Sequence, residues 1–185
     1  DFRKEKSGHK DICAELIDVR VLVDYISDNY ADIAEQNGID YTVDIEDEFV
    51  ISSDRDFLEK ILLNLISNAF KYTPNNGYIH LNIWQNKDNK SLEIRIKNSG
   101  RGLTTAQMEG IFNKYEFYDS PHLKNSISTG IGLNLTQSLI ELLGGIIKVE
   151  STYGEYVEFA ATIPPLHSNL VEESKSEVSQ TLEHT

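Results

Sequence analysis

Asn64 and Asn68 stand four residues apart in an otherwise apolar run of the sequence. On a helix this spacing places both carboxamides on one stripe. An unpaired buried amide costs about 1–3 kcal/mol, so either neighbouring backbone groups or a ligand must satisfy these side chains. Carboxamide oxygens suit a magnesium ion that bridges phosphates. The plainer interpretation is that both asparagines are ordinary polar positions on a helix surface.

Two glycine-rich segments favour the ligand. In the first, Asn98, Gly100 and Gly102 follow a predicted strand, so the backbone can pass close to a flat ring while the Asn98 amide contacts the edge of a base; an ordinary turn is the alternative. In the second, at 129–133, glycines open a predicted helix and expose N–H groups at its positive end, which suits an anion. A glycine cap is the alternative there. The joint occurrence of all these blocks is far rarer by chance than any one alone.

The charge and composition of the chain limit its partners. A formal net charge of −13 argues against nucleic acid, because binding to phosphate chains depends on clustered cations. A phosphate site must therefore be local and use the few cations near the glycines, together with backbone amides and a metal ion. Those cations are Lys71, Arg101, Lys114 and Lys124. Cys13 is the single cysteine, so an internal disulfide or a multi-thiolate metal site is excluded, which fits a reducing compartment.

Hydrophobic periodicity predicts four helices and six strands. The helices are expected at 19–36, from a cap at Ser53 or Asp54 to residue 72, at 105–112 and at 129–143, and the strands at 39–45, 49–51, 78–86, 91–97, 146–151 and 156–163. The pattern predicts an α+β fold, a two-layer α/β sandwich. Its mixed, mainly antiparallel sheet of about five strands is expected to have hairpins at both ends and three helices over one face.

Three parts of the chain are distinguished by composition. Residues 1–12 are polar and are expected to form the end of a helix, and residues 13–164 are expected to form one domain. The long loop at 99–128 has little periodicity, which is typical of a functional or mobile segment. Residues 165–185 are rich in serine and glutamate and predict an acidic, disordered linker or tail.

The blocks resemble the motifs of sensor histidine kinases. The segment 64–74 is similar to their N box, 98–102 to their first glycine box, 111–115 to their F box and 128–133 to their second glycine box. The resemblance covers roughly residues 12–163. It implies the Bergerat ATP-binding fold shared with Hsp90-like chaperones, type II topoisomerases and mismatch-repair ATPases. ATP and Mg²⁺ are the implied ligands, with a flexible lid at about 100–128.

The resemblance also implies roles for individual residues. Asn68 would be the principal magnesium ligand, Asn64 would support the metal and the phosphates, Lys71 would contact phosphate and Tyr72 would lie near the nucleoside. A solvated helix end and plain packing remain the alternatives for Lys71 and Tyr72. The implied catalytic residues are Asn64, Lys71 and Lys114. The implied nucleotide-binding residues are Asn64, Asn68, Lys71, Tyr72, Asn98, Gly100, Gly102, Leu103, Thr129, Gly130, Ile131, Gly132 and Leu133.

Three positions depart from the family pattern. Asn98 replaces the usual aspartate that accepts a hydrogen bond from the adenine amino group, so adenine recognition is expected to survive in weakened form. Ser128 replaces a glycine, which restricts the hinge of the lid. Phe117 replaces an arginine, so that either Lys114, Lys124 or Arg101 stabilises the charge of the transferred group or this stabilisation is poorer.

The chemistry at Asn64 predicts phosphoryl transfer instead of hydrolysis. Relatives that hydrolyse ATP carry glutamate there, and an amide cannot take a proton from water. None of the five histidines stands in the expected acceptor setting, so all are assigned to surface or packing positions. The acceptor is expected upstream, on a dimerisation domain whose last helix ends within residues 1–12.

The implied partners are therefore that histidine-bearing domain of the same protein and a response-regulator receiver domain, downstream or in trans. No nucleic acid partner is expected. The chain is expected to be a cytoplasmic domain of an inner-membrane protein that contacts the membrane only through its missing N-terminal part. One alternative is a catalytically weak nucleotide-binding regulatory module that acts through lid position. A chaperone-like ATPase is a weaker alternative, which Asn64 disfavours.

Overall fold

The computed structural model describes residues 12–46, 48–113 and 131–166. Its elements, in chain order, are β1 (Ala14–Asp18), α1 (Val19–Asn37), β2 (Asp40–Ile45), β3 (Val50–Asp54), α2 (Arg55–Tyr72), β4 (Tyr78–Gln85), β5 (Leu92–Ser99), α3 (Thr105–Gly110), α4 (Ile131–Leu142), β6 (Ile146–Thr152) and β7 (Tyr156–Ile163). The expected segments at 1–11, 114–130 and 167–185 lie outside the described residues. They include most of the expected dimerisation helix end, most of the lid and nearly all of the tail.

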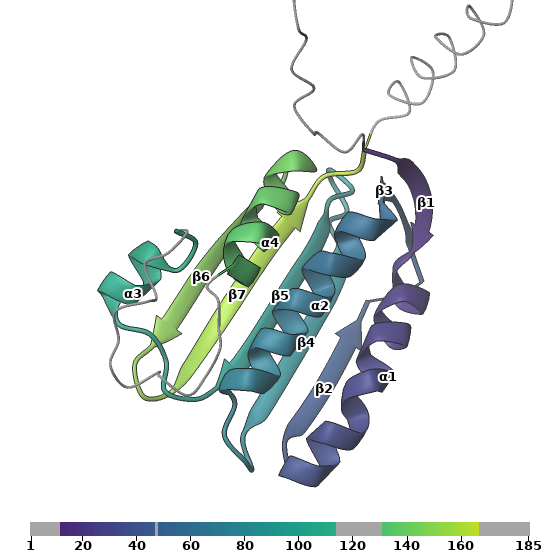
Figure 1. The fold of residues 1–185 in the computed structure, drawn as a ribbon. Helices are drawn as coiled ribbons and strands as arrows, with labels where there is room; N and C mark the ends of the chain where they lie inside the picture. The colour runs from purple at the N-terminus through teal and green to yellow at the C-terminus, as the bar shows by residue number, and fades with distance from the viewer. Residues whose placement is uncertain (1–11, 47, 114–130, 167–185) are drawn as a thin grey trace, which may run out of the picture.

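Five strands form one sheet in the order β2-β4-β5-β7-β6. Only β2 and β4 are parallel, and the other three neighbouring pairs are antiparallel. Three helices, α1, α2 and α4, lie side by side over one face of this sheet (Figure 1). The predicted two-layer sandwich with a mixed, mainly antiparallel sheet is confirmed.

Alternation along the strands builds the core between the two layers. Ile79, Leu81 and Ile83 of β4 face the helices and are buried, and the residues between them point to the opposite face. From the helix layer, α2 buries Leu58 and Ile61 against this sheet with almost no exposed area. Because both layers contribute whole apolar faces, the position of α2 over the sheet is strongly determined.

Two expectations about the strands were wrong. The strand β1 was not expected, because only Ile17 of its residues is buried and Leu16 is 79% exposed. It pairs antiparallel with β3 in a separate two-stranded sheet. Hairpins do not close both ends of the main sheet either. The β6–β7 hairpin forms one edge. The other edge strand is β2, and it is parallel to its neighbour β4, from which it is separated along the chain by β3 and α2.

The helix ends follow the local sequence. Asp54, one of the two expected caps, accepts a hydrogen bond from the backbone N–H of Phe57 at 3.0 Å and begins α2. Gly38 ends α1 in the left-handed conformation with φ of 62°. The third helix is shorter than expected, and α4 is described from Ile131 onward.

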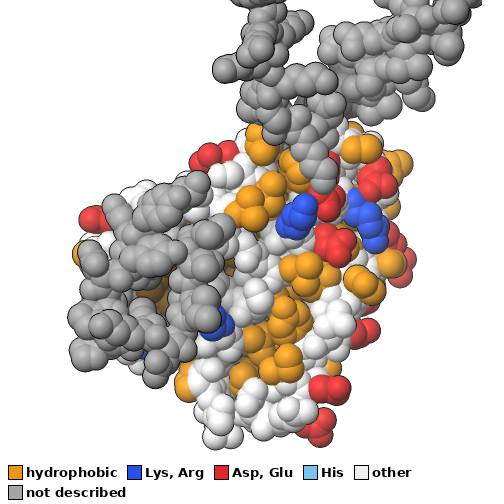
Figure 2. All heavy atoms as spheres, viewed as in Figure 1, with side chains coloured by type: hydrophobic (Ala, Val, Ile, Leu, Met, Phe, Trp, Pro, Cys, Tyr) orange, Lys and Arg blue, Asp and Glu red, His pale blue; other side chains and the backbone are white. Residues whose placement is uncertain are grey.

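Part of the net negative charge of the chain lies on the exposed surface of α1. Figure 2 shows acidic side chains along the side of the molecule where α1 lies. Asp24, Asp28 and Asp32 of this helix are exposed. Among the helices that the structure describes, none has both the length and the apolar character needed to cross a bilayer.

Candidate nucleotide-binding site

The two asparagines of α2 lie on one stripe of the helix, as expected from their spacing. Both side chains are half-buried, whereas Leu65 and Ile66 between them are buried in the core. The stripe therefore runs along the border between the core and the helix surface. At this border, carboxamides are within reach both of other parts of the chain and of a ligand.

Asn64 contacts the first turn of α4, 68 residues away in the sequence. Its Nδ2 atom donates hydrogen bonds to the carbonyl oxygen of Gly132 and to Oγ1 of Thr136, the latter at 2.8 Å. A Cβ atom at residue 132 would lie 2.8 Å from Oδ1 of Asn64, which explains the glycine there. The amide nitrogen is thus satisfied within the protein, as one of the two interpretations of the sequence required. The oxygen is the atom of this side chain with metal-ligand chemistry.

Asn98 ends the row of inward-pointing residues on β5. It follows Ile94 and Ile96 on the helix-covered face and is 4% exposed. Its Nδ2 atom donates to the carbonyl oxygen of Ser99 at 3.1 Å. The side chain therefore lies in the sheet layer below α2, at the end of β5 where the first glycine segment begins.

The glycines after β5 are explained by contacts within the chain. A Cβ atom at Gly100 would lie 2.7 Å from the carbonyl oxygen of Tyr72. One at Gly102 would overlap the carbonyl oxygen of Thr152, and φ of Gly102 is 67°. Both close approaches are to the protein's own backbone. The alternative of a structural turn therefore accounts for these glycines, and their expected approach to a base stays a prediction.

The end of α2 borders an open hollow of about 790 Å³. Lys71, Tyr72, Gly100 and Arg101 all line it. Of the residues predicted from the sequence, it therefore brings together Lys71, Tyr72, Gly100 and Arg101 but neither asparagine of α2. Arg101 donates a hydrogen bond to the hydroxyl of Tyr153 at 3.5 Å.

The remaining predicted site residues lie partly within and partly outside the described part of the chain. Leu103 and Leu133 pack against the core, and the backbone N–H of Leu103 donates to Oγ of Ser151 at 2.8 Å. Ile131 and Gly132 stand in the first turn of α4. The others lie outside the described residues: Lys114, Thr129 and Gly130, together with Phe117, Lys124 and Ser128.

Two residues near the site were missed from the sequence. Thr136 is fully buried beside Asn64, and Nδ2 of Asn134 donates to the carbonyl oxygen of Phe112 at 2.9 Å. Asn134 thereby connects α4 to the segment similar to the F box. The signal was a pair of polar residues inside an otherwise apolar helical pattern, which is the same signal that Asn64 and Asn68 give on α2.

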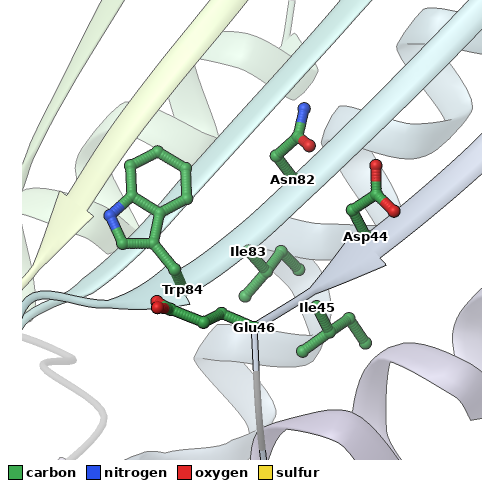
Figure 3. Close-up of a pocket in the computed structure, with 6 residues that line it drawn as sticks. All are labelled: Asp44, Ile45, Glu46, Asn82, Ile83 and Trp84. Atoms are coloured by element: carbon green, nitrogen blue, oxygen red, sulfur yellow. The ribbon is translucent and has the colours of Figure 1, made fainter.

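Other candidate groups do not compete with this site. The described part of the chain contains no cluster of three or more histidine, cysteine or acidic residues that could hold a metal. A second hollow, of about 380 Å³, lies at the ends of β2 and β4 between Asp44, Glu46 and Trp84 (Figure 3), and no predicted site residue lines it. His80, the one histidine in the described ranges, packs against the ring of Tyr78 at 4.8 Å between centroids.

Known proteins match both the sequence and the fold. The model of the family of histidine kinase-, DNA gyrase B- and HSP90-like ATPases matches residues 53–167. The hybrid signal transduction protein dokA of Dictyostelium discoideum is 32% identical over 158 residues, which are 82% of this chain and 9% of dokA. The circadian input-output histidine kinase CikA of Synechococcus elongatus is 35% identical over 115 residues, 62% of this chain and 15% of CikA.

Solved structures share the fold. The nucleotide-free catalytic domain of histidine kinase ThkA aligns with a TM-score of 0.69 at 24% identity, over 83% of this chain and 96% of that domain. Full-length ShkA in complex with AMPPNP aligns with a TM-score of 0.72 at 22% identity, over 84% of this chain and 32% of ShkA.

The two-layer fold is shared with the solved catalytic domain of ThkA. The chain belongs to the family of histidine kinase-, DNA gyrase B- and HSP90-like ATPases. Within that family, the predicted resemblance to the ATPase domain of sensor histidine kinases is confirmed. The chain spans only 9% and 15% of the lengths of dokA and CikA.

Proposed function

We propose that this chain is the ATP-binding catalytic part of a sensor histidine kinase. It passes the γ-phosphoryl group of ATP to a histidine on an upstream dimerisation domain. The observation that carries this proposal is the contact between Asn64 and Gly132, because it joins the carboxamide stripe of α2 to the glycine-opened start of α4. This hydrogen bond brings two motifs that are far apart in the sequence into contact, which supports their proposed use in one site.

The residues present fit a magnesium nucleotide. The carboxamide oxygens of Asn68 and Asn64 are hard oxygen donors of the kind that Mg²⁺ accepts alongside phosphate oxygens. Gly132 has no side chain, and a Cβ atom there would lie 2.8 Å from Oδ1 of Asn64, so the glycine allows this oxygen to lie close to the start of α4. The first turn of α4 contains no acidic side chain. The partial positive charge of the helix dipole at this end is therefore not neutralised by a carboxylate of that turn. When bound, Mg²⁺ would neutralise part of the phosphate charge.

The chain's own residues favour transfer over hydrolysis. An amide at position 64 can orient a group by hydrogen bonding, but it cannot remove a proton from water. Phosphoryl transfer depends mainly on positioning and on stabilising charge, for which amides and cations suffice. Lys71, beside the hollow at the end of α2, supplies a cation for phosphate. Lys114 has the same proposed role.

The wider setting of the protein is part of the proposal. A receiver domain is the proposed next acceptor of the phosphoryl group, in line with the hybrid relative dokA and with the solved complex of ThkA and its response regulator TrrA. The domain is proposed to work in the cytoplasm, with any membrane anchor in another part of the parent protein. Nucleic acid is not among the proposed partners.

Binding of a non-hydrolysable ATP analogue, with magnesium and with a chelator, tests the site. Magnesium is expected to tighten binding about tenfold or more in the wild type, and Asn68→Ala is expected to lose this gain because it removes a metal ligand. Asn29→Ala is the matched control, since Asn29 is an exposed asparagine on α1. Affinity that is independent of both the metal and Asn68→Ala would refute the site.

Phosphoryl transfer needs a separate experiment with the full-length parent protein. Radiolabelled ATP is expected to label a histidine of the upstream domain, and steady hydrolysis is expected to stay far below that of a dedicated ATPase. The competing function, a regulatory module that binds nucleotide without transferring phosphate, is favoured by Asn98 in place of the usual aspartate. A parent protein that binds ATP but forms no phosphohistidine would support that alternative.

A further inference from the structure

Thr136 joins the contact between α2 and α4. It stands one turn after Gly132 on α4, and its side chain is fully buried. Its hydroxyl donates a hydrogen bond to the carbonyl oxygen of Gly132 at 2.9 Å and accepts one from Nδ2 of Asn64 at 2.8 Å. With the bond from Nδ2 of Asn64 to the same carbonyl, the three groups form a closed triangle.

The triangle determines which way the Asn64 amide points. The Gly132 carbonyl can only accept, and a threonine hydroxyl has a single proton to donate. Because that proton is directed to the carbonyl, a lone pair of the hydroxyl faces Asn64. A rotated amide would place Oδ1 against the carbonyl oxygen of Gly132. Nδ2 of Asn64 therefore faces its two acceptors on α4, and the orientation of Oδ1 follows.

We propose that Thr136 is a positioning residue of the nucleotide site, holding the Asn64 carboxamide so that its oxygen and not its NH₂ group is presented to the magnesium ion of a bound nucleotide. This inference rests on the proposed function. An NH₂ group is a donor without a lone pair for a cation, so a turned amide would repel the metal instead of binding it. Thr136 itself contacts neither metal nor nucleotide and acts through Asn64.

The test compares nucleotide affinity with and without magnesium in variants of nearly equal shape. Thr136→Val removes the hydroxyl and keeps the volume, whereas Thr136→Ser keeps the hydroxyl. Thr162→Val is the matched control, because Thr162 is a half-buried threonine on β7 whose hydroxyl donates to Glu93. The probe is a non-hydrolysable ATP analogue, titrated with excess magnesium or with chelator, and thermal unfolding is measured on every variant.

Thr136→Val is expected to weaken magnesium-dependent binding about threefold to tenfold, the effect of one hydrogen bond, and to change metal-free binding less than about twofold. Thr136→Ser and Thr162→Val are expected to keep the wild-type ratio of the two affinities. In an Asn64→Ala background, Thr136→Val should change this ratio no further, because the side chain through which Thr136 acts is gone. Thr136→Ala gives the same readout if the valine variant does not fold.

If magnesium still tightens nucleotide binding to the wild type, three results would overturn the role of Thr136 and leave the proposed function standing. They are an unchanged ratio in Thr136→Val, an equal loss of affinity with and without magnesium, and a serine variant that behaves like the valine variant. The second of these would show that Thr136 only supports the packing of α4. Loss of magnesium dependence in the wild type itself would overturn the proposed function and this inference together.

Discussion

The backbone N–H of Cys13 donates a 2.8 Å hydrogen bond to Oδ2 of Asp54, 41 residues later in the chain. The other carboxylate oxygen of Asp54 accepts from the backbone N–H of Phe57 at 3.0 Å and caps α2. Asp54 is 4% exposed. One carboxylate therefore connects the two-stranded sheet to the start of the helix that carries the carboxamide stripe.

Asp54→Ala is expected to lower the free energy of unfolding by about 1–3 kcal/mol. The variant loses a helix cap and also the acceptor for a second backbone N–H. Urea unfolding followed by far-ultraviolet circular dichroism measures the change.

Asp18→Ala is the control for this prediction. Asp18 caps α1 through one hydrogen bond of 3.1 Å to Val21 and is exposed. Its loss is expected to cost about 0.5–1 kcal/mol, in the lower part of the range for caps. Equal losses in the two variants would contradict the connecting role of Asp54.

Gly102→Ala is expected to destabilise the fold by about 1–3 kcal/mol more than Gly154→Ala, because its methyl group would overlap a backbone oxygen. Both glycines have positive φ, 67° and 86°, so the conformational cost is shared. They differ in surroundings, since Gly102 approaches Thr152 and a Cβ at Gly154 meets nothing within 4 Å. Thermal unfolding of both variants measures the difference. If Gly102→Ala and Gly154→Ala destabilise the fold equally, the close approach of Gly102 to Thr152 does not add to the free-energy cost of the substitution.

Asn98→Asp is expected to increase the preference for ATP analogues over GTP analogues about threefold to tenfold, the effect of one hydrogen bond. A carboxamide can accept from an adenine amino group through its oxygen or donate to a guanine oxygen through its nitrogen, whereas a carboxylate only accepts. Competition binding with the two analogues gives the ratio.

The same substitution removes the hydrogen bond from Nδ2 of Asn98 to Ser99, so some loss of stability accompanies it. For this reason the ratio of two affinities, and not either affinity alone, is the informative quantity. Asn29→Asp on the exposed face of α1 is expected to leave the ratio at the wild-type value. An unchanged ratio in Asn98→Asp would place Asn98 away from the base.

Tyr41 is expected to make the fold sensitive to alkaline pH. Its hydroxyl donates to Oγ of Ser27 at 3.0 Å, and burial raises the pKa of Tyr41 above its ordinary value. The unfolded chain therefore ionises first, so the stability contributed by the neutral tyrosine is present below about pH 10 and is lost as the pH rises through the folded-state pKa. Burial also raises the pKa of Tyr30, which adds to the same trend.

Tyr41→Phe tests this prediction by urea unfolding at a series of pH values above about 9, where tyrosine begins to ionise. The variant is expected to lose stability less steeply with rising pH, because one of the two tyrosines with a raised pKa in the described part of the chain is gone. At neutral pH it should be less stable by about 0.5–1.5 kcal/mol, the value of one hydrogen bond. A slope equal to that of the wild type would contradict the assignment.

Local patterns in the sequence were sufficient for most elements. The alternation in β4 and the cap at Asp54 are readable because burial and capping act over a few residues. The family motifs around Asn64 and Gly132 are local as well. By contrast, β1 could not be predicted, since Leu16 is exposed and the partner of the strand, β3, lies more than 30 residues further along the chain.

The sequence by itself therefore determined the two-layer fold and the family, and it proposed the residues of the candidate site. Only the tertiary structure decided the contacts that these residues make. The carbonyl oxygen of Thr152 lies so close to Gly102 that a side chain would overlap it. Gly132 and Thr136 orient the Asn64 amide. The physical reason is distance along the chain. A hydrogen bond between residues 68 positions apart leaves no periodic trace in either segment, because each segment satisfies its own local pattern whether or not the other is present.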